Sequence, residues 1–124
     1  MKRWIKAVAE KKKKIPGNLS YVFMSDEELL KLNVQFLKHN TYTDIITFDY
    51  SDGKTISGEI FISVDRVREN ANKMNVDFDD ELKRVIIHGV LHLCGYKDKT
   101  KSDAEIMRKE EDQGLRLWKK LTNE

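Results

Sequence analysis

The segment from Asp79 to Thr100 constrains the fold of this chain more than any other stretch. Its apolar residues recur at helical spacing, and acidic residues open it, as the N-terminus of a helix favours. Gly95 follows the last apolar residue, which predicts a left-handed helix end. His88 and His92 are four residues apart, so their imidazoles share one face of this helix, with Cβ atoms ~5–6 Å apart. We therefore expect a buried central helix that presents a histidine pair.

Asp98 turns this pair into a candidate metal site. A histidine pair alone often only satisfies a buried hydrogen bond, but Asp98 follows the Gly95 turn and offers a third ligand. Two neutral imidazoles and one carboxylate leave a fourth position open on zinc, as in catalytic rather than structural sites. Zinc peptidases of the His-Glu-x-x-His type place their base directly after the first histidine, where this chain has Gly89. A peptidase mechanism on this helix would therefore lack its base.

Three strings resemble the YbeY family of bacterial endoribonucleases. They are His-Gly-Val-Leu-His-Leu-Cys-Gly-Tyr at 88–96, Thr-Asp-Ile-Ile-Thr-Phe at 43–48 and Gly-Glu-Ile-Phe-Ile at 58–62. The resemblance spans about residues 20 to 115 and implies a zinc-dependent, single-strand-specific endoribonuclease that acts in ribosomal RNA maturation. It also implies one Zn²⁺ per chain, with ribosomal RNA and the small ribosomal subunit as partners.

The resemblance implies His88, His92 and Asp98 as the metal ligands. The family usually has a third histidine at the last of these positions, so Asp98 keeps a ligand but lowers the positive charge of the site by one unit. The competing interpretation is that Asp98 only caps the loop and that Asp103 or a solvent molecule completes the site. Cys94 lies two positions beyond His92 and points away from the histidine face, so we expect it in the core.

A second departure concerns the cations ahead of the Thr-Asp string. Family members have an aromatic residue, an arginine and a nearby lysine there; the alignment places Phe36, Leu37 and His39 at these positions. Lys38 can supply the missing charge from one residue along, so Lys38 and His39 are the candidate catalytic cations. Arg66, Arg68 and Arg84 are further candidate cations near the scissile phosphate, with an ordinary surface role favoured for each. A local backbone role is favoured for Asp44, and Glu59 is explained equally by an exposed strand position and by a place facing the metal cleft.

The pattern predicts an α+β fold in a single domain, 1–124. A small mixed β-sheet containing one hairpin is packed by about five helices, with the metal site on a central helix. Helices are expected near residues 1–13, 25–37, 64–75, 79–94 and from 102 onwards, and strands near 19–24, 43–50 and 55–63.

Local signals refine this arrangement. Asp52-Gly53 predicts a hairpin turn, Pro16-Gly17-Asn18 predicts a break, and capping boxes are expected at 25–28 and 102–105. The strand–helix–strand order over 19–50 suggests a parallel pairing beside the hairpin. Family members typically begin with a strand before the first helix, and residues 1–13 show no strand pattern.

Composition narrows the function classes. The net charge of +2 is too small to indicate nucleic-acid binding, so an RNA contact must come from local clustering. The run Lys11–Lys14 favours a solvated helix C-terminus over a dedicated RNA contact. A single cysteine excludes an internal disulfide and agrees with a reducing cytoplasm, and we expect no disulfide-linked partner. No apolar run approaches the ~20 residues of a membrane span, so we expect a soluble cytoplasmic protein.

Three functions stay open. The leading hypothesis is a zinc-dependent endoribonuclease of ribosomal RNA maturation. The second is a non-catalytic ribosome-assembly factor with a structural metal site, which the leucine at position 37 favours. The third is a metallopeptidase-like hydrolase, which Gly89 disfavours.

Overall fold

The computed structural model describes residues 1–122, which form five α-helices around a three-stranded sheet, with one short π-helical turn. In chain order the elements are α1 (Lys2–Lys11), β1 (Ile15–Met24), α2 (Asp26–Leu32), the π-helical turn η1 (Asn33–Leu37), β2 (Ile45–Asp49), β3 (Thr55–Ser63), α3 (Val64–Met74), α4 (Phe78–Leu93) and α5 (Lys101–Thr122). The predicted α+β class, the small mixed sheet and the five helices are confirmed. Over these residues no helix combines the length and the apolar character needed to cross a bilayer.

β3 is the central strand of the sheet. β1 pairs with it in parallel and β2 pairs with it antiparallel through the hairpin turn, giving the order β1-β3-β2. The predicted parallel pairing beside the hairpin is confirmed, but the partner of β1 is β3 and not β2, because β3 lies between them. β3 alternates buried Ile56, Ile60 and Ile62 with half-buried residues, and this apolar content suits the middle of the sheet.

β1 begins earlier than the sequence predicts. The expected break at 16–18 lies inside the strand, where the register shifts between Pro16 and Leu19. β1 is an edge strand, which tolerates a proline. Gly17 permits the close approach to β3, because a Cβ there would lie 2.4 Å from the Ser57 hydroxyl. The Pro16-Gly17-Asn18 sequence therefore marks a bulge within the strand and not a turn between two elements.

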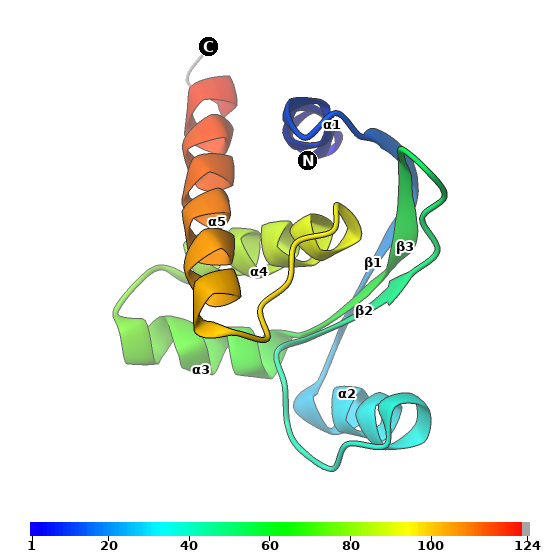
Figure 1. Cartoon of the computed structure of the whole chain (residues 1–124). Coiled ribbons are helices and arrows are strands. Elements are labelled where there is room, and N and C mark those ends of the chain that lie inside the picture. The colour runs from blue at the N-terminus through cyan, green and yellow to red at the C-terminus, as the bar shows by residue number, and fades with distance from the viewer. Residues whose placement is uncertain (123–124) are drawn as a thin grey trace.

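α4 lies at the centre of the molecule, between the sheet and α5 (Figure 1). Gly89 lets the helix approach the sheet, because an added Cβ would lie 2.9 Å from Ile45 Cδ1 and 3.1 Å from Ile60 Cγ2. The position that holds the base of zinc peptidases is thus used for packing. Phe36 of η1 packs on Phe48 of β2, with ring centroids 5.8 Å apart, over the opposite face of the sheet.

The two predicted capping boxes have different outcomes. The first is confirmed: Glu28 N donates to Ser25 Oγ at 3.2 Å, and the Glu28 carboxylate accepts from Ser25 N at 3.2 Å. The second was misplaced by two residues, since Asp103 N donates to Thr100 Oγ1 at 3.0 Å and α5 begins at Lys101. The loop between α4 and α5 is therefore short, and this shortness holds Asp98 near α4.

Candidate metal centre

His88, His92 and Asp98 converge on one point above α4. The Nε2 atoms of the two histidines are 2.9 Å apart. Asp98 Oδ2 lies 3.2 Å from the first of them and 3.5 Å from the second. The helix supplies two ligand atoms from successive turns of one face, and the loop supplies the third. The structure thus brings together all three predicted ligands.

The end of α4 explains how Asp98 reaches the histidines. Gly95 takes a positive φ of 103°, and Tyr96 N donates to Leu91 O at 3.0 Å, so the chain turns back over the last helical turn. His92 Nδ1 lies 3.0 Å from the Tyr96 carbonyl oxygen. Because a carbonyl only accepts, Nδ1 carries the hydrogen and donates it, which leaves Nε2 with a lone pair toward the site.

Glu111 holds His88 in the same way from α5. Its Oε2 is 2.6 Å from His88 Nδ1, and its Oε1 accepts from Arg84 Nη1 at 3.0 Å. Burial lowers the pKa of His88, but the hydrogen bond and charge of Glu111 outweigh that effect and raise it above its usual value. Such a carboxylate behind a ligating histidine fixes its orientation and raises its basicity. Sequence reasoning missed Glu111, because a residue 23 positions away carries no local signal.

The three ligand atoms fit a tetrahedral metal ion. Ligands of zinc at about 2.0–2.2 Å in a tetrahedron lie about 3.3–3.6 Å apart, and the three separations here are 2.9, 3.2 and 3.5 Å. Two imidazole lone pairs that face each other also repel unless a cation lies between them. The set of two nitrogens and one oxygen can therefore hold a metal ion. Asp103, the alternative third ligand, instead caps α5.

The metal centre opens into a cleft of about 570 Å³. One wall is β2 with the residues just before it, including Asp44, and the other carries the candidate ligands. Leu37, which the resemblance places at the position of an arginine, lines this cleft, and Lys99 contributes a cation that sequence reasoning missed. Lys38 and His39 are exposed beyond η1 and are not among the residues that line it.

Asp44 precedes β2 and lines the cleft, whereas Glu59 lies on the face of the sheet away from α4. Asp44 faces the cleft, accepts from Asn70 Nδ2 at 3.4 Å and has its pKa raised by burial. Its backbone oxygen also accepts from Ser63 N at 2.9 Å, so the predicted structural role and a place in the site coexist. Glu59 alternates with the residues that face α4 and accepts from the Tyr50 hydroxyl at 2.8 Å, away from the metal centre.

The candidate arginines and Cys94 have structural partners. Arg66 pairs with Asp26 at 2.9 Å, Arg68 lies 5.1 Å from the ring centroid of Phe78, and Arg84 holds Glu111. Cys94 packs against the core as predicted, and burial raises the pKa of its thiol.

Comparison with known proteins decides the family. The family model described as Endoribonuclease YbeY matches residues 1–119. The chain belongs to the YbeY endoribonuclease family. The Endoribonuclease YbeY of Flavobacterium johnsoniae is 52% identical over 115 residues, 93% of this chain and 83% of the relative. The Parabacteroides distasonis YbeY is 54% identical over 114 residues, 92% of this chain and 80% of the relative.

The family assignment extends to the fold. The solution structure of TM1509 from Thermotoga maritima matches with a TM-score of 0.71 at 27% identity, covering 98% of this chain and 81% of that one. In this chain the fold brings Asp98 beside the two histidines and places Leu37 in the cleft.

Proposed function

We propose that this YbeY protein is a zinc-dependent, single-strand-specific endoribonuclease that acts in ribosomal RNA maturation. The observation that carries the proposal is a three-ligand metal centre with an open position, at the side of a cleft, in a chain of this family. When bound there, zinc supplies a Lewis acid that polarises a phosphoryl oxygen and lowers the pKa of water to ~7.

The residues of this chain prepare the site for that chemistry. Glu111 and the Tyr96 carbonyl fix the two imidazoles, so both Nε2 atoms face Asp98 without rearrangement. The carboxylate of Asp98 lowers the positive charge of the centre relative to a third histidine. Lys99 lies in the cleft beside the ligands and can contact the phosphate of the substrate strand. We expect slower hydrolysis than with three histidines, because a less positive centre activates water less strongly.

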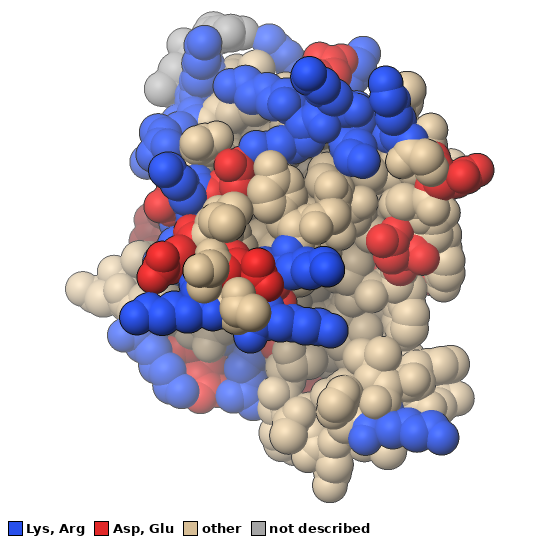
Figure 2. Space-filling model, in the orientation of Figure 1, with Lys and Arg blue, Asp and Glu red and all other residues tan. Residues whose placement is uncertain are grey.

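Ribosomal RNA in the cytoplasm, within the small ribosomal subunit, is the proposed substrate. The formal charge of the chain is only +2, yet Lys and Arg side chains gather over α1 and the adjacent end of α5 on the face drawn in Figure 2. Acidic and basic side chains alternate lower on that face (Figure 2). This clustering suits a phosphate backbone better than the net charge suggests, and it predicts salt-sensitive binding.

A non-catalytic role in ribosome assembly is the second candidate function. The observation that favours it is Leu37, which lines the cleft at the position where family members carry an arginine. Without that cation, RNA binding and a structural metal site could persist while cleavage is lost. A peptidase-like hydrolase finds no support, since Gly89 provides no side chain and packs on the sheet.

RNA cleavage with and without a chelator separates these functions. We expect the metal-loaded protein to cut single-stranded RNA, and the chelator to abolish cutting until zinc is restored. The doubly substituted His88→Ala/His92→Ala protein is the control and should be inactive. Binding of RNA with no metal-dependent cleavage would reject the nuclease and favour the assembly role.

A further inference from the structure

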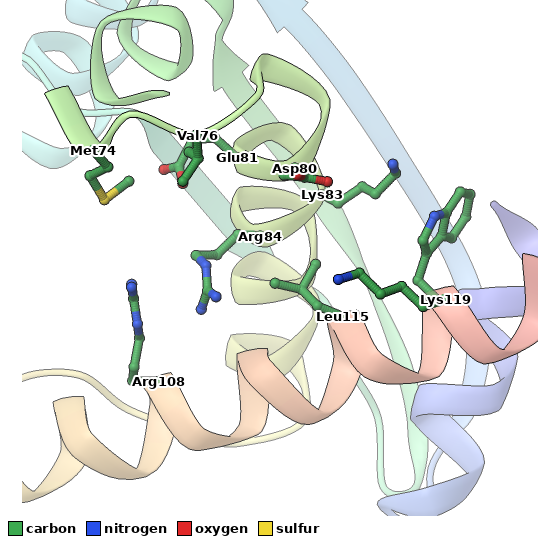
Figure 3. A pocket seen from close by; sticks show the side chains of 10 residues that line it. Met74, Val76, Asp80, Glu81, Lys83, Arg84, Arg108, Leu115 and Lys119 are labelled. Carbon is green, nitrogen blue, oxygen red and sulfur yellow. The ribbon is translucent and has the colours of Figure 1, made fainter. Parts of the chain in front are cut away.

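A second cavity lies between α4 and α5, beside the turn that follows α3. Its volume is about 530 Å³, within the range of about 300–1,000 Å³ typical of small-molecule pockets. Met74, Val76 and Leu115 provide its apolar surface. Figure 3 shows Arg84 extending from α4 and Arg108 from α5 into the space between the helices. An apolar wall with two guanidinium groups suits a ligand that combines a flat base with a phosphate.

Glu81 is the unusual residue of this cavity. Glu81 is buried, with 6% exposure, and it lines this cavity. Its carboxylate has no hydrogen-bond or ion-pair partner among residues 1–122. Burial raises the pKa of Glu81, and the charge of Asp44 adds to that effect. A carboxylate that lines a cavity without a protein donor can accept hydrogen bonds there from a ligand that offers N–H groups.

The cavity continues into the metal centre. Glu81 precedes His88 by two helical turns on the same face of α4, about 10 Å along the axis. Glu81, Arg84 and Arg108 also line a smaller cavity of about 250 Å³ that reaches His88 and Asp98. A strand whose phosphate lies at the metal centre can therefore extend along α4 into the larger cavity.

We propose that this cavity binds a guanine base of the RNA strand, next to the bond that is cleaved, through the carboxylate of Glu81. This inference rests on the proposed nuclease function. Guanine presents two neighbouring N–H donors, N1–H and the amino group, on its Watson–Crick edge, which match the two oxygens of a carboxylate. Uracil presents one N–H donor, and adenine and cytosine only an amino group.

The cations complete the recognition of a nucleotide. Arg84 is fixed by Glu111 at 3.0 Å and by Asp112 at 2.7 Å, so its guanidinium plane is held in place for stacking. Arg108 is exposed at the mouth and is positioned for a phosphate. Single-stranded RNA is typically bound by such stacking and by hydrogen bonds to unpaired base edges.

Binding of two labelled strands tests the proposal. Fluorescence anisotropy compares oligouridine carrying one guanosine with all-uridine RNA on the metal-loaded protein, and the products are mapped in the same samples. We expect about tenfold tighter binding of the guanosine strand, the effect of one bidentate base contact. Glu81→Gln should remove this preference, and Glu105→Gln, an exposed acid on α5, should preserve it. Arg108→Ala should weaken both strands and reduce the salt dependence.

The outcomes separate the subsite from the nuclease. Metal-dependent cleavage of both strands with equal binding overturns the guanine subsite and leaves the nuclease standing. A preference that survives Glu81→Gln also overturns it. Tight binding of free guanosine monophosphate, without a preference between the two strands, overturns the proposal that a base of the RNA strand occupies the cavity. It would assign the cavity to a free mononucleotide. Absence of binding and cleavage with either strand contradicts both proposals. The strand comparison uses the unaltered protein, so it decides the question even if Glu81→Gln fails to fold.

Discussion

Glu111 Oε2 lies 2.6 Å from Nδ1 of His88, so a carboxylate on α5 orients a candidate metal ligand on α4 through the nitrogen that faces away from Asp98. Glu111 is itself buried, with 5% exposure, and its other oxygen accepts from Arg84. The candidate metal centre is therefore tied to the packing of α4 and α5, and we expect metal affinity to depend on that packing.

Glu111→Gln tests this coupling. The amide keeps the size of the side chain but removes the charge that raises the basicity of His88, so metal affinity should fall about 10- to 100-fold. Competition with a fluorescent zinc chelator measures the change. Glu105→Gln, an exposed substitution on the same helix, is the matched control. Equal metal affinity in the two variants would contradict a role for Glu111 behind His88.

Substitutions of Asp98 test whether its carboxylate is the third metal ligand. Asp98→Ala should lower zinc affinity at least about tenfold by removing one of three ligands, whereas Asp98→His should retain zinc because a histidine nitrogen binds at a similar distance, ~2.0–2.1 Å. Asp103→Ala should leave affinity nearly unchanged, since Asp103 caps α5. Zinc binding by Asp98→Ala as tight as in the parent protein would reject the three-ligand centre.

Lys99 is the cation that the structure places in the cleft. Lys99→Ala should weaken binding of single-stranded RNA and reduce the slope of log affinity against log salt by about 0.7, the value for one phosphate contact on a single strand. Lys38→Ala and His39→Ala should have smaller effects, because neither residue lines the cleft. Filter binding at several salt concentrations provides the slopes. A larger loss from Lys38 or His39 than from Lys99 would instead support the cations expected from the sequence.

The start of α5 provides a stability test. Thr100→Ala removes the hydroxyl that accepts from Asp103 N, and it should lower the free energy of unfolding by about 0.5–2 kcal/mol. Ser102 lies in the first turn of α5 and is exposed, so Ser102→Ala should change the free energy of unfolding little. Urea unfolding of the metal-free proteins measures both. A greater loss from Ser102→Ala would place the cap where the sequence pattern predicted it.

Features encoded by local pattern were predictable from the sequence. The histidine spacing, the Gly95 turn and the alternation in β3 each depend only on residues that are close in the sequence. The sequence therefore predicted α4, the hairpin and the three candidate ligands. The start of α5 shows the limit of such patterns, because the predicted capping box at 102–105 lies instead at 100–103, where Thr100 and Asp103 fit the same motif.

Features that depend on distant contacts were not predictable. The order of the strands was misjudged because the apolar content of β3 gives it the central place, whatever the order along the chain. Glu111 contacts His88 through the packing of α5 on α4, and Lys99 lines the cleft from the loop between these two helices. Lys38 follows η1 with a left-handed backbone, φ 58°, and does not line the cleft, which the sequence pattern did not indicate.

Titration of activity with zinc tests the central claim most directly. Protein stripped of metal should be inactive, and cleavage of single-stranded RNA should rise in proportion to added zinc and stop rising at one equivalent per chain. His88→Ala should show no such rise at the same zinc concentrations. Full cleavage by the stripped protein, or activity that ignores the loss of His88, would contradict a nuclease that works through a metal ion held by His88, His92 and Asp98.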